Sequence, residues 1–235
     1  MTNWIAAALT LALCLIWLRL MDFAAHRGWI ESRLSRKIIH IGTGPLFVLC
    51  WLMFDNAPEA RWLAASIPLL ITIQFAFIGL GVIKDEASVQ AMSRTGDRRE
   101  ILRGPLFYGI AFVALTLLYW KETPIGMTAL MLMCGGDGIA DVVGRRVASA
   151  KLPWSRDKSL AGTVSVFLGG FILAAFILWV YVSLRLFSPP FAGYLGPLLI
   201  LSLAAAAVES LPFRDVDNLT VPLVAVLLGQ LLFVV

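Results

Sequence analysis

The sequence has few charged residues. Asp, Glu, Lys and Arg make up 14% of its 235 residues, whereas soluble globular domains carry about 25%. Hydrophobic residues make up 60%, and the mean hydropathy is +0.86. A soluble domain of this length cannot keep so much apolar surface out of water. The composition therefore excludes a soluble protein and predicts an all-α polytopic membrane protein.

Other signals are missing too. Cys14, Cys50 and Cys134 are not spaced as metal ligands, and all lie in or beside apolar segments, so we interpret them as small buried hydrophobic residues. The sequence contains no P-loop pattern and no basic stretch interleaved with aromatic residues, which argues against nucleic acid as a partner. It shows no low-complexity run and no clear repeat. We expect one membrane domain over residues 1–235.

Eight apolar windows approach the length of about 20 residues that a membrane-spanning helix needs. Window 124–143 is unusual, because its apolar part ends at Cys134 and is followed by glycines and aspartates; without it the count is seven. The first window lacks a basic region before it, so we expect a retained helix and not a cleaved signal peptide. The windows are 4–21, 38–54, 62–83, 105–120, 124–143, 160–187, 191–208 and 219–235.

Loop charge favours eight transmembrane helices with the N- and C-termini outside. In this arrangement fifteen of the nineteen Lys and Arg residues lie in cytoplasmic stretches, as the positive-inside rule requires. Twelve of the fifteen acidic residues lie on the same side, which that rule does not explain. Solubility and internal ion pairs are one explanation, and a polar active site at the cytoplasmic membrane edge is the other. The stretches are 22–37, 84–103, 137–160 and 209–218.

Segment 134–146 (CGGDGIADVVGRR) favours the second explanation, a polar active site at the membrane edge. Asp137 and Asp141 are four residues apart, so they share a face of a helix and repel each other unless a cation such as Mg²⁺ lies between them. Acids at a membrane edge are usually functional. Glycines allow close approach of another backbone or of a phosphate. The alternative is a frayed helix end with solvated aspartates. The glycines are Gly135, Gly136 and Gly138.

Segment 151–163 (KLPWSRDKSLAGT) opens the next helix. Lys158, Ser159 and Thr163 surround the start of that helix, where free N–H groups and the helix dipole favour anions. The segment thus predicts phosphate binding. Ordinary basic anchoring near lipid headgroups is the alternative.

Segment 208–222 joins the last two windows. Glu209 follows a run of small apolar residues at a helix end, so we expect it to point inward. Asp217 and Asn218 stand at the start of the last helix, and one of them can serve simply as its cap.

Segment 35–44 (SRKIIHIGTG) places His40 one helical turn from the basic pair Arg36 and Lys37. A lone His is more often structural than catalytic, but the neighbouring charges make a functional role equally plausible. The basic stretch 84–103 either grips headgroups or a nucleotide, or anchors its helix.

Together these segments resemble the phytol, polyprenol and dolichol kinase family, which is related to phosphatidate cytidylyltransferases, and they are most similar to the phytol kinase branch. The resemblance covers residues 35–222. It implies one integral membrane kinase domain that phosphorylates a long-chain isoprenoid alcohol, such as phytol, geranylgeraniol or polyprenol, with CTP as donor and Mg²⁺. The stretches that carry it are SRKIIHIGTG, CGGDGIADVVGRR, KLPWSRDKSLAGT and VESLPFRDVDNLTVPL.

The resemblance also implies roles for the residues that match the family's GDG-x-x-D, K-S-x-x-G and E-S-L-P…D-N-L-T elements. One departure is Val216, which separates two acids that are often adjacent in the family. We expect metal ligands at Asp137, Asp141 and Asp217, and catalytic roles for Asp141, Lys158 and Glu209. Nucleotide contacts are expected from Lys158, Ser159, Gly162, Thr163, Arg145, Arg146, Gly135, Gly136 and Gly138. Further candidates are Arg36, Lys37, His40 and Asn218.

Two other functions remain open. CDP-lipid synthesis uses the same nucleotide and metal, but the chain lacks the H-G-G-x-x-D-R-x-D ending of cytidylyltransferases. A transporter predicts polar residues near the bilayer midplane, whereas here they cluster at one face. The sequence leaves open the length of the alcohol, CTP against ATP, and homo-oligomer formation. The expected location is integral to a membrane, the inner or plasma membrane if the source is bacterial.

Overall fold

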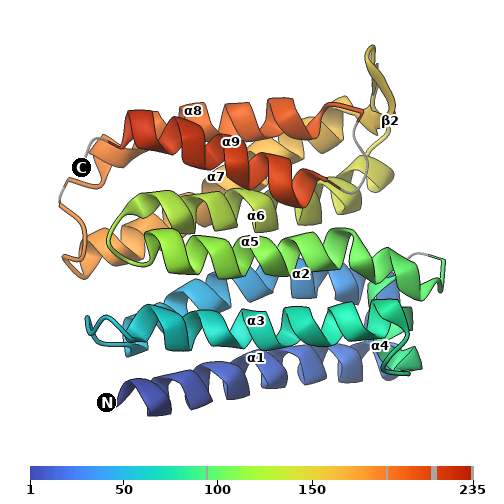
Figure 1. The fold of residues 1–235 in the computed structure, drawn as a ribbon. Helices are drawn as coiled ribbons and strands as arrows, with labels where there is room; N and C mark the ends of the chain where they lie inside the picture. Colours follow the sequence, from blue (N-terminus) through green and yellow to red (C-terminus); the bar gives the residue numbers. More distant parts are fainter. Residues whose placement is uncertain (94, 189, 213–215, 234–235) are drawn as a thin grey trace. The chain divides into compact units, whose positions relative to one another are not determined.

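A computed structural model describes residues 1–93, 95–188, 190–212 and 216–233 (Figure 1). The chain divides into two compact units, Met1–Leu117 and Leu118–Val235, and each is described by itself. The single domain expected over residues 1–235 stays a prediction. For some helical positions the description is limited to the backbone, and these are Asp22, Ser32, Arg33, Arg36, Gln90, Ala91, Asp137, Asp141 and Arg145.

Within the described residues, six helices are long and apolar enough to cross a membrane. Two shorter apolar helices, Lys37–Met53 and Asp217–Leu232, match the two remaining windows of the sequence. The prediction of an all-α polytopic membrane protein is confirmed, while eight crossings and external termini stay predictions. The six are Asn3–His26, Ala60–Leu80, Arg98–Tyr119, Pro124–Gly144, Leu160–Ser183 and Ala192–Glu209.

The first unit is built on four long helices, α1, α2, α3 and α5. Helix α1 packs against α2 and α3, and the rings of Phe47 on α2 and Phe112 on α5 lie 5.6 Å apart. These apolar contacts bury the faces that the helices do not present to lipid. The elements are α1 (Asn3–His26), α2 (Ser32–Cys50), η1 (Trp51–Met53), α3 (Ala60–Leu80), α4 (Glu86–Met92), η2 (Arg98–Leu102) and α5 (Gly104–Tyr119).

The basic stretch 84–103 folds into α4 and η2, which the sequence analysis did not predict. Each short element begins with an acidic cap. The Asp85 carboxylate accepts hydrogen bonds from the backbone N–H and the hydroxyl of Ser88, and these bonds lower the pKa of Asp85. The Asp97 carboxylate accepts from the backbone N–H of Arg99 at 2.9 Å. Apart from position 94, which lies outside the described residues, the stretch is therefore built mainly of these two short helices.

The second unit is an antiparallel bundle with α6 at its centre. Helix α6 packs against α7, α8 and α9, and 81% of its apolar window is buried, against 17% to 39% in the other candidate spans. The unusual window of the sequence is thus a helix enclosed by protein. The elements are α6 (Pro124–Arg146), β1 (Lys151–Leu152), β2 (Ser155–Ser159), α7 (Leu160–Ser183), α8 (Ala192–Glu209) and α9 (Asp217–Leu232).

Glycines bring α6 and α7 into close contact. A Cβ atom added to Gly135 would lie 2.6 Å from the carbonyl oxygen of Gly169, and one added to Gly169 would lie equally close to the carbonyl oxygen of Gly135. Such small residues let membrane helices approach closely. Gly136 faces Val166 in the same interface. Of the two uses expected for Gly135 and Gly136, the close approach seen here is that of another helix.

The up-and-down order of these helices gathers several segment ends at one end of the second unit. Figure 1 shows the end of α6, the β1–β2 hairpin, the start of α7, the end of α8 and the start of α9 at the same end of the bundle. Three of the four segments singled out in the sequence therefore meet there.

Candidate active site

A β-hairpin carries the predicted phosphate-binding lysine. Strands β1 and β2 pair antiparallel, with Lys151 opposite Ser159 and Leu152 opposite Ser155. The tip is tied to the end of α8, because the indole N–H of Trp154 donates to the carbonyl oxygen of Ser210 at 3.1 Å and to its hydroxyl at 3.3 Å. The hairpin therefore holds Lys158, on β2, beside the end of α8.

Lys158 and Glu209 form an ion pair, so two residues expected from separate motifs are brought together. Glu209 is the last residue of α8 and is 7% exposed, whereas the side chain of Lys158 is 27% exposed. A buried carboxylate is unfavourable unless it is paired. Lys158 supplies that pairing and keeps access to solvent, where an anionic ligand would arrive.

The start of α7 is capped from within the protein. The Ser159 hydroxyl accepts from the N–H of Gly162 at 3.2 Å, and the Thr163 hydroxyl donates to the Ser159 carbonyl. The N–H groups of Leu160 and Ala161 donate to the Ala150 carbonyl and the Ser149 hydroxyl. These N–H groups are occupied in this structure, so an anion here would rely on the Lys158 side chain.

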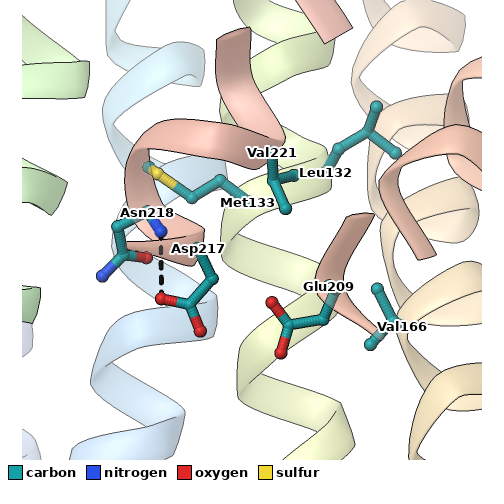
Figure 2. A pocket seen from close by; sticks show the side chains of 7 residues that line it. All are labelled: Leu132, Met133, Val166, Glu209, Asp217, Asn218 and Val221. Atoms are coloured by element: carbon teal, nitrogen blue, oxygen red, sulfur yellow. Dashed lines mark hydrogen bonds between the residues drawn. The ribbon is translucent and has the colours of Figure 1, made fainter. Parts of the chain in front are cut away.

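A small pocket lies beside the ion pair, between α6, α7, α8 and α9 (Figure 2). The pocket and its open mouth hold about 200 Å³ of empty space. In Figure 2 the carboxylates of Glu209 and Asp217 enter it from the end of α8 and the start of α9. Asp217 is the first residue of α9, and its carboxylate accepts from the backbone N–H of Asn218 at 3.1 Å. The pocket is lined by Leu132, Met133, Val166, Glu209, Asp217, Asn218 and Val221.

The predicted metal site lies mostly outside the described side chains. Positions 137 and 141 both fall within α6, as predicted, but the side chains of Asp137, Asp141 and Arg145 are not among those described. Arg146 ends α6 and is exposed. Within the described part of the chain, no three His, Cys, Asp or Glu side chains gather as metal ligands.

The segment around His40 belongs to the first unit. His40 lies on α2, where its carbonyl oxygen accepts from the hydroxyl of Tyr108 at 2.9 Å and its ring lies 4.4 Å from the Tyr108 ring. Lys37 is half-buried on the same helix, and the side chain of Arg36 is not among those described. These contacts show that His40 packs against Tyr108 on α5. A functional role for His40 stays a prediction.

Sequence reasoning missed Trp154 and Ser210. The signal was present, because Trp154 is the one aromatic residue in the polar segment 151–159. The sequence does not reveal its partner, because Ser210 lies 56 residues further along the chain.

A polytopic helical membrane protein with a lysine–glutamate ion pair beside a pocket lined by two carboxylates fits the class of membrane enzymes. The chain is 44% identical to "Probable phytol kinase 1, chloroplastic" of Oryza sativa subsp. japonica, over 92% of this chain and 69% of that protein. It is 43% identical to "Probable phytol kinase, chloroplastic" of Zea mays, over 92% of this chain and 72% of that protein. It is 40% identical to "Phytol kinase 1, chloroplastic" of Arabidopsis thaliana, over 88% and 69%.

The chain therefore belongs to the phytol kinase family. It is an enzyme, a phosphotransferase with an alcohol acceptor. No family model matches the sequence. No solved structure matches it either.

Proposed function

We propose that this protein transfers the γ-phosphoryl group of CTP to the hydroxyl of a long-chain isoprenoid alcohol, giving the alcohol monophosphate and CDP. The acceptor is phytol, geranylgeraniol or a polyprenol. The observation that carries the proposal is the similarity to relatives named phytol kinase over 92% of the chain. The ion pair of Lys158 and Glu209 beside the pocket supports it, since phosphoryl transfer depends mainly on positioning and charge neutralisation.

In this proposal the donor phosphates bind at the solvent side of the hairpin. Lys158 turns from Glu209 to the β- and γ-phosphates, with Arg145 and Arg146 as further cations. Ser159, Gly162 and Thr163 then act by fixing the start of α7 under Lys158, because their polar groups already bond to each other.

The donor set suits a magnesium ion. Asp217 presents an oxygen ligand to the pocket, and Mg²⁺ is bound in proteins by one or two carboxylates together with substrate phosphates. Asp137, Asp141 and Asp217 would hold it. When bound, the ion supplies neutralisation of the phosphate charge.

Glu209 has the role of orienting and deprotonating the alcohol. The hydroxyl oxygen attacks the γ-phosphorus, the bond from that phosphorus to the β-γ bridging oxygen breaks, and CDP leaves. The hydroxyl proton passes to Glu209. Asp141 is the second candidate for this base.

The proposed location of the active site follows from the solubility of the two substrates and from the charge of the loops. The isoprenoid tail stays in the bilayer between helices, so that only its hydroxyl reaches the polar end of the bundle. We place that end on the cytoplasmic side, because the basic loops gather there in the eight-span arrangement. If the source is bacterial, the membrane is the inner or plasma membrane.

The test is an assay of purified protein in lipid nanodiscs with CTP or ATP. The acceptors are phytol, geranylgeraniol, farnesol and diacylglycerol, and phosphatidate is the alternative substrate. We expect an isoprenoid monophosphate and CDP. Turnover of phosphatidate with release of pyrophosphate, and of no isoprenoid alcohol, would replace the proposal by CDP-lipid synthesis. Preference for ATP would refute the choice of donor alone.

A further inference from the structure

We infer that Trp154, at the tip of the β1–β2 hairpin, binds the base of the donor nucleotide by stacking, while Lys158 binds the phosphates. This inference rests on the proposed function and deepens it, because it assigns the nucleoside end of the donor site. It gives Trp154 a second role, since the same side chain also holds the hairpin against the end of α8.

The indole of Trp154 is fixed at one edge and accessible elsewhere. Its N–H donates to the carbonyl oxygen of Ser210 at 3.1 Å and to the Ser210 hydroxyl at 3.3 Å. The residue is nevertheless 56% exposed. The N–H lies on the rim of the ring, so both bonds position the ring without covering its faces. An aromatic ring that is held in place before a ligand arrives loses little conformational entropy on binding, and its face suits a planar partner.

Trp154 and Lys158 meet at one place in the fold. Their side chains bond to consecutive residues at the end of α8, Ser210 and Glu209. The two positions are four residues apart, a distance of about 13 Å at most along an extended strand, and both side chains reach toward the same helix end. In a nucleotide, the ribose and the α-phosphate lie between the base and the outer phosphates. One donor molecule is therefore long enough to contact both side chains.

The surroundings of Trp154 favour a nucleotide over the bilayer. A Trp at a membrane interface keeps its ring among lipid and its polar N–H toward water and headgroups. The N–H of Trp154 is bonded to the protein instead. Three exposed charged residues, Lys151, Arg156 and Asp157, lie within three positions of it. The carboxylate of Asp157 is unfavourable beside lipid, whereas the ammonium of Lys158 attracts phosphate.

The contribution of such a contact is large enough to measure. Stacking of a base on an aromatic side chain contributes about 5- to 150-fold to binding. It tolerates any base, because every base has a planar face. The inference therefore holds for CTP and for ATP alike, and the choice between them is not assigned to Trp154.

The test separates the ring of Trp154 from its N–H. Trp154→Phe keeps an aromatic ring and loses the hydrogen-bond donor to Ser210, whereas Trp154→Gln keeps a side-chain N–H and loses the ring. The readout is the dissociation constant of inorganic triphosphate divided by that of CTP, both measured by titration calorimetry in nanodiscs with excess Mg²⁺. We expect Trp154→Gln to lower this ratio about tenfold or more. Trp154→Phe should keep it within about threefold, because loss of the N–H affects both ligands alike.

Trp179→Leu, which removes a similarly exposed indole from α7, is the matched control and should keep the wild-type ratio. An unchanged ratio in folded Trp154→Gln would overturn the inference. If CTP and triphosphate weaken equally in both Trp154 variants, the residue only holds the hairpin. If the ratio is unchanged and brominated phospholipid quenches the fluorescence that Trp154→Phe lacks, the ring belongs to the bilayer. Thermal melting identifies a Trp154→Gln protein that fails to fold, and Trp154→Leu then decides by the same ratio.

Calorimetry needs no turnover, so it separates this inference from the proposed function. A wild type that binds CTP about tenfold or more tightly than triphosphate, and loses that preference in Trp154→Gln, supports the inference even if no alcohol is phosphorylated. A wild type that phosphorylates an alcohol but binds CTP no more tightly than triphosphate refutes the inference alone. A wild type that binds neither ligand and phosphorylates no alcohol overturns both proposals.

Discussion

Removing the charge of Lys158 should destabilise the protein as well as stop phosphoryl transfer. Glu209 is 7% exposed and Lys158 is 27% exposed. Removing one partner of a fully buried ion pair costs about 3–5 kcal/mol. Because water reaches part of Lys158 and screens the pair, we expect Lys158→Ala to lower the free energy of unfolding by about 2–3 kcal/mol. Glu209→Gln should cost less, since the lysine left behind can turn to solvent.

The double variant Lys158→Ala with Glu209→Gln distinguishes a charge effect from lost packing. With both charges gone, position 209 no longer holds a buried carboxylate that has lost its lysine. We expect the double variant to recover about 1–2 kcal/mol of the stability lost in Lys158→Ala, and still to be inactive. Lys151→Ala changes an exposed lysine on the paired strand of the same hairpin and should stay within about 0.5 kcal/mol of the wild type.

The measurement is reversible unfolding in mixed micelles, with phosphoryl transfer assayed on the same preparations. If the double variant is no more stable than Lys158→Ala, the lysine does not neutralise Glu209 in the folded protein. If Lys158→Ala keeps near-normal transfer, Lys158 is not the phosphate ligand. The two results are independent. The free energy of unfolding depends on the Lys158–Glu209 ion pair without nucleotide, whereas the transfer rate depends on the contact of Lys158 with the bound donor.

Three further predictions concern the rest of the second unit. Asp137→Asn and Asp141→Asn should each abolish transfer while the melting temperature stays close to that of the wild type; near-normal activity in both would remove the metal assignment. Trp154→Phe keeps the ring but loses the N–H that reaches Ser210. It should lower kcat about tenfold with little change in the alcohol KM, and an equal loss in Trp179→Phe, an exposed Trp on α7, would contradict a positioning role. Gly169→Ala should cost about 1–3 kcal/mol of unfolding free energy, because its Cβ would meet the Gly135 carbonyl at 2.6 Å. Gly193→Ala has open space around its Cβ and should be tolerated. Equal stability of the two variants would contradict the close packing of α6 and α7.

The helices could be predicted from the sequence because a bilayer leaves few choices. An apolar run of spanning length must satisfy its backbone hydrogen bonds internally, so it forms a helix whatever its neighbours are. Window 124–143 is the instructive case. Its glycines and aspartates made it look like an incomplete span, yet α6 continues through them to Arg146, because α7 covers the glycines closely.

The hairpin could not be predicted in the same way. Strand β1 has two residues, and segment 151–159 shows no alternation of polar and apolar residues that would indicate a strand. Its position depends on the contact between Trp154 and Ser210, which joins distant parts of the chain. For the same reason the motifs indicated Lys158 and Glu209 individually, as phosphate ligand and as base. Their pairing could not be predicted, because the fold brings together two residues that are 51 positions apart in the sequence.

The burial of α6 explains how polar chemistry can sit at the end of a membrane helix. A charged group on a helix that faces lipid is expensive, even with the side chain reaching toward the interface. Helix α6 is instead surrounded by α7, α8 and α9, and most of its apolar window is buried in protein. Positions 137 and 141 therefore follow a buried apolar stretch and lie in the half of α6 that leads to the hairpin and Lys158. In the proposed reaction, an isoprenoid alcohol approaches the site through the bilayer and a nucleotide through water. Only the end of the bundle is accessible to both, so the proposed function requires the reacting groups to lie there and not at the bilayer midplane.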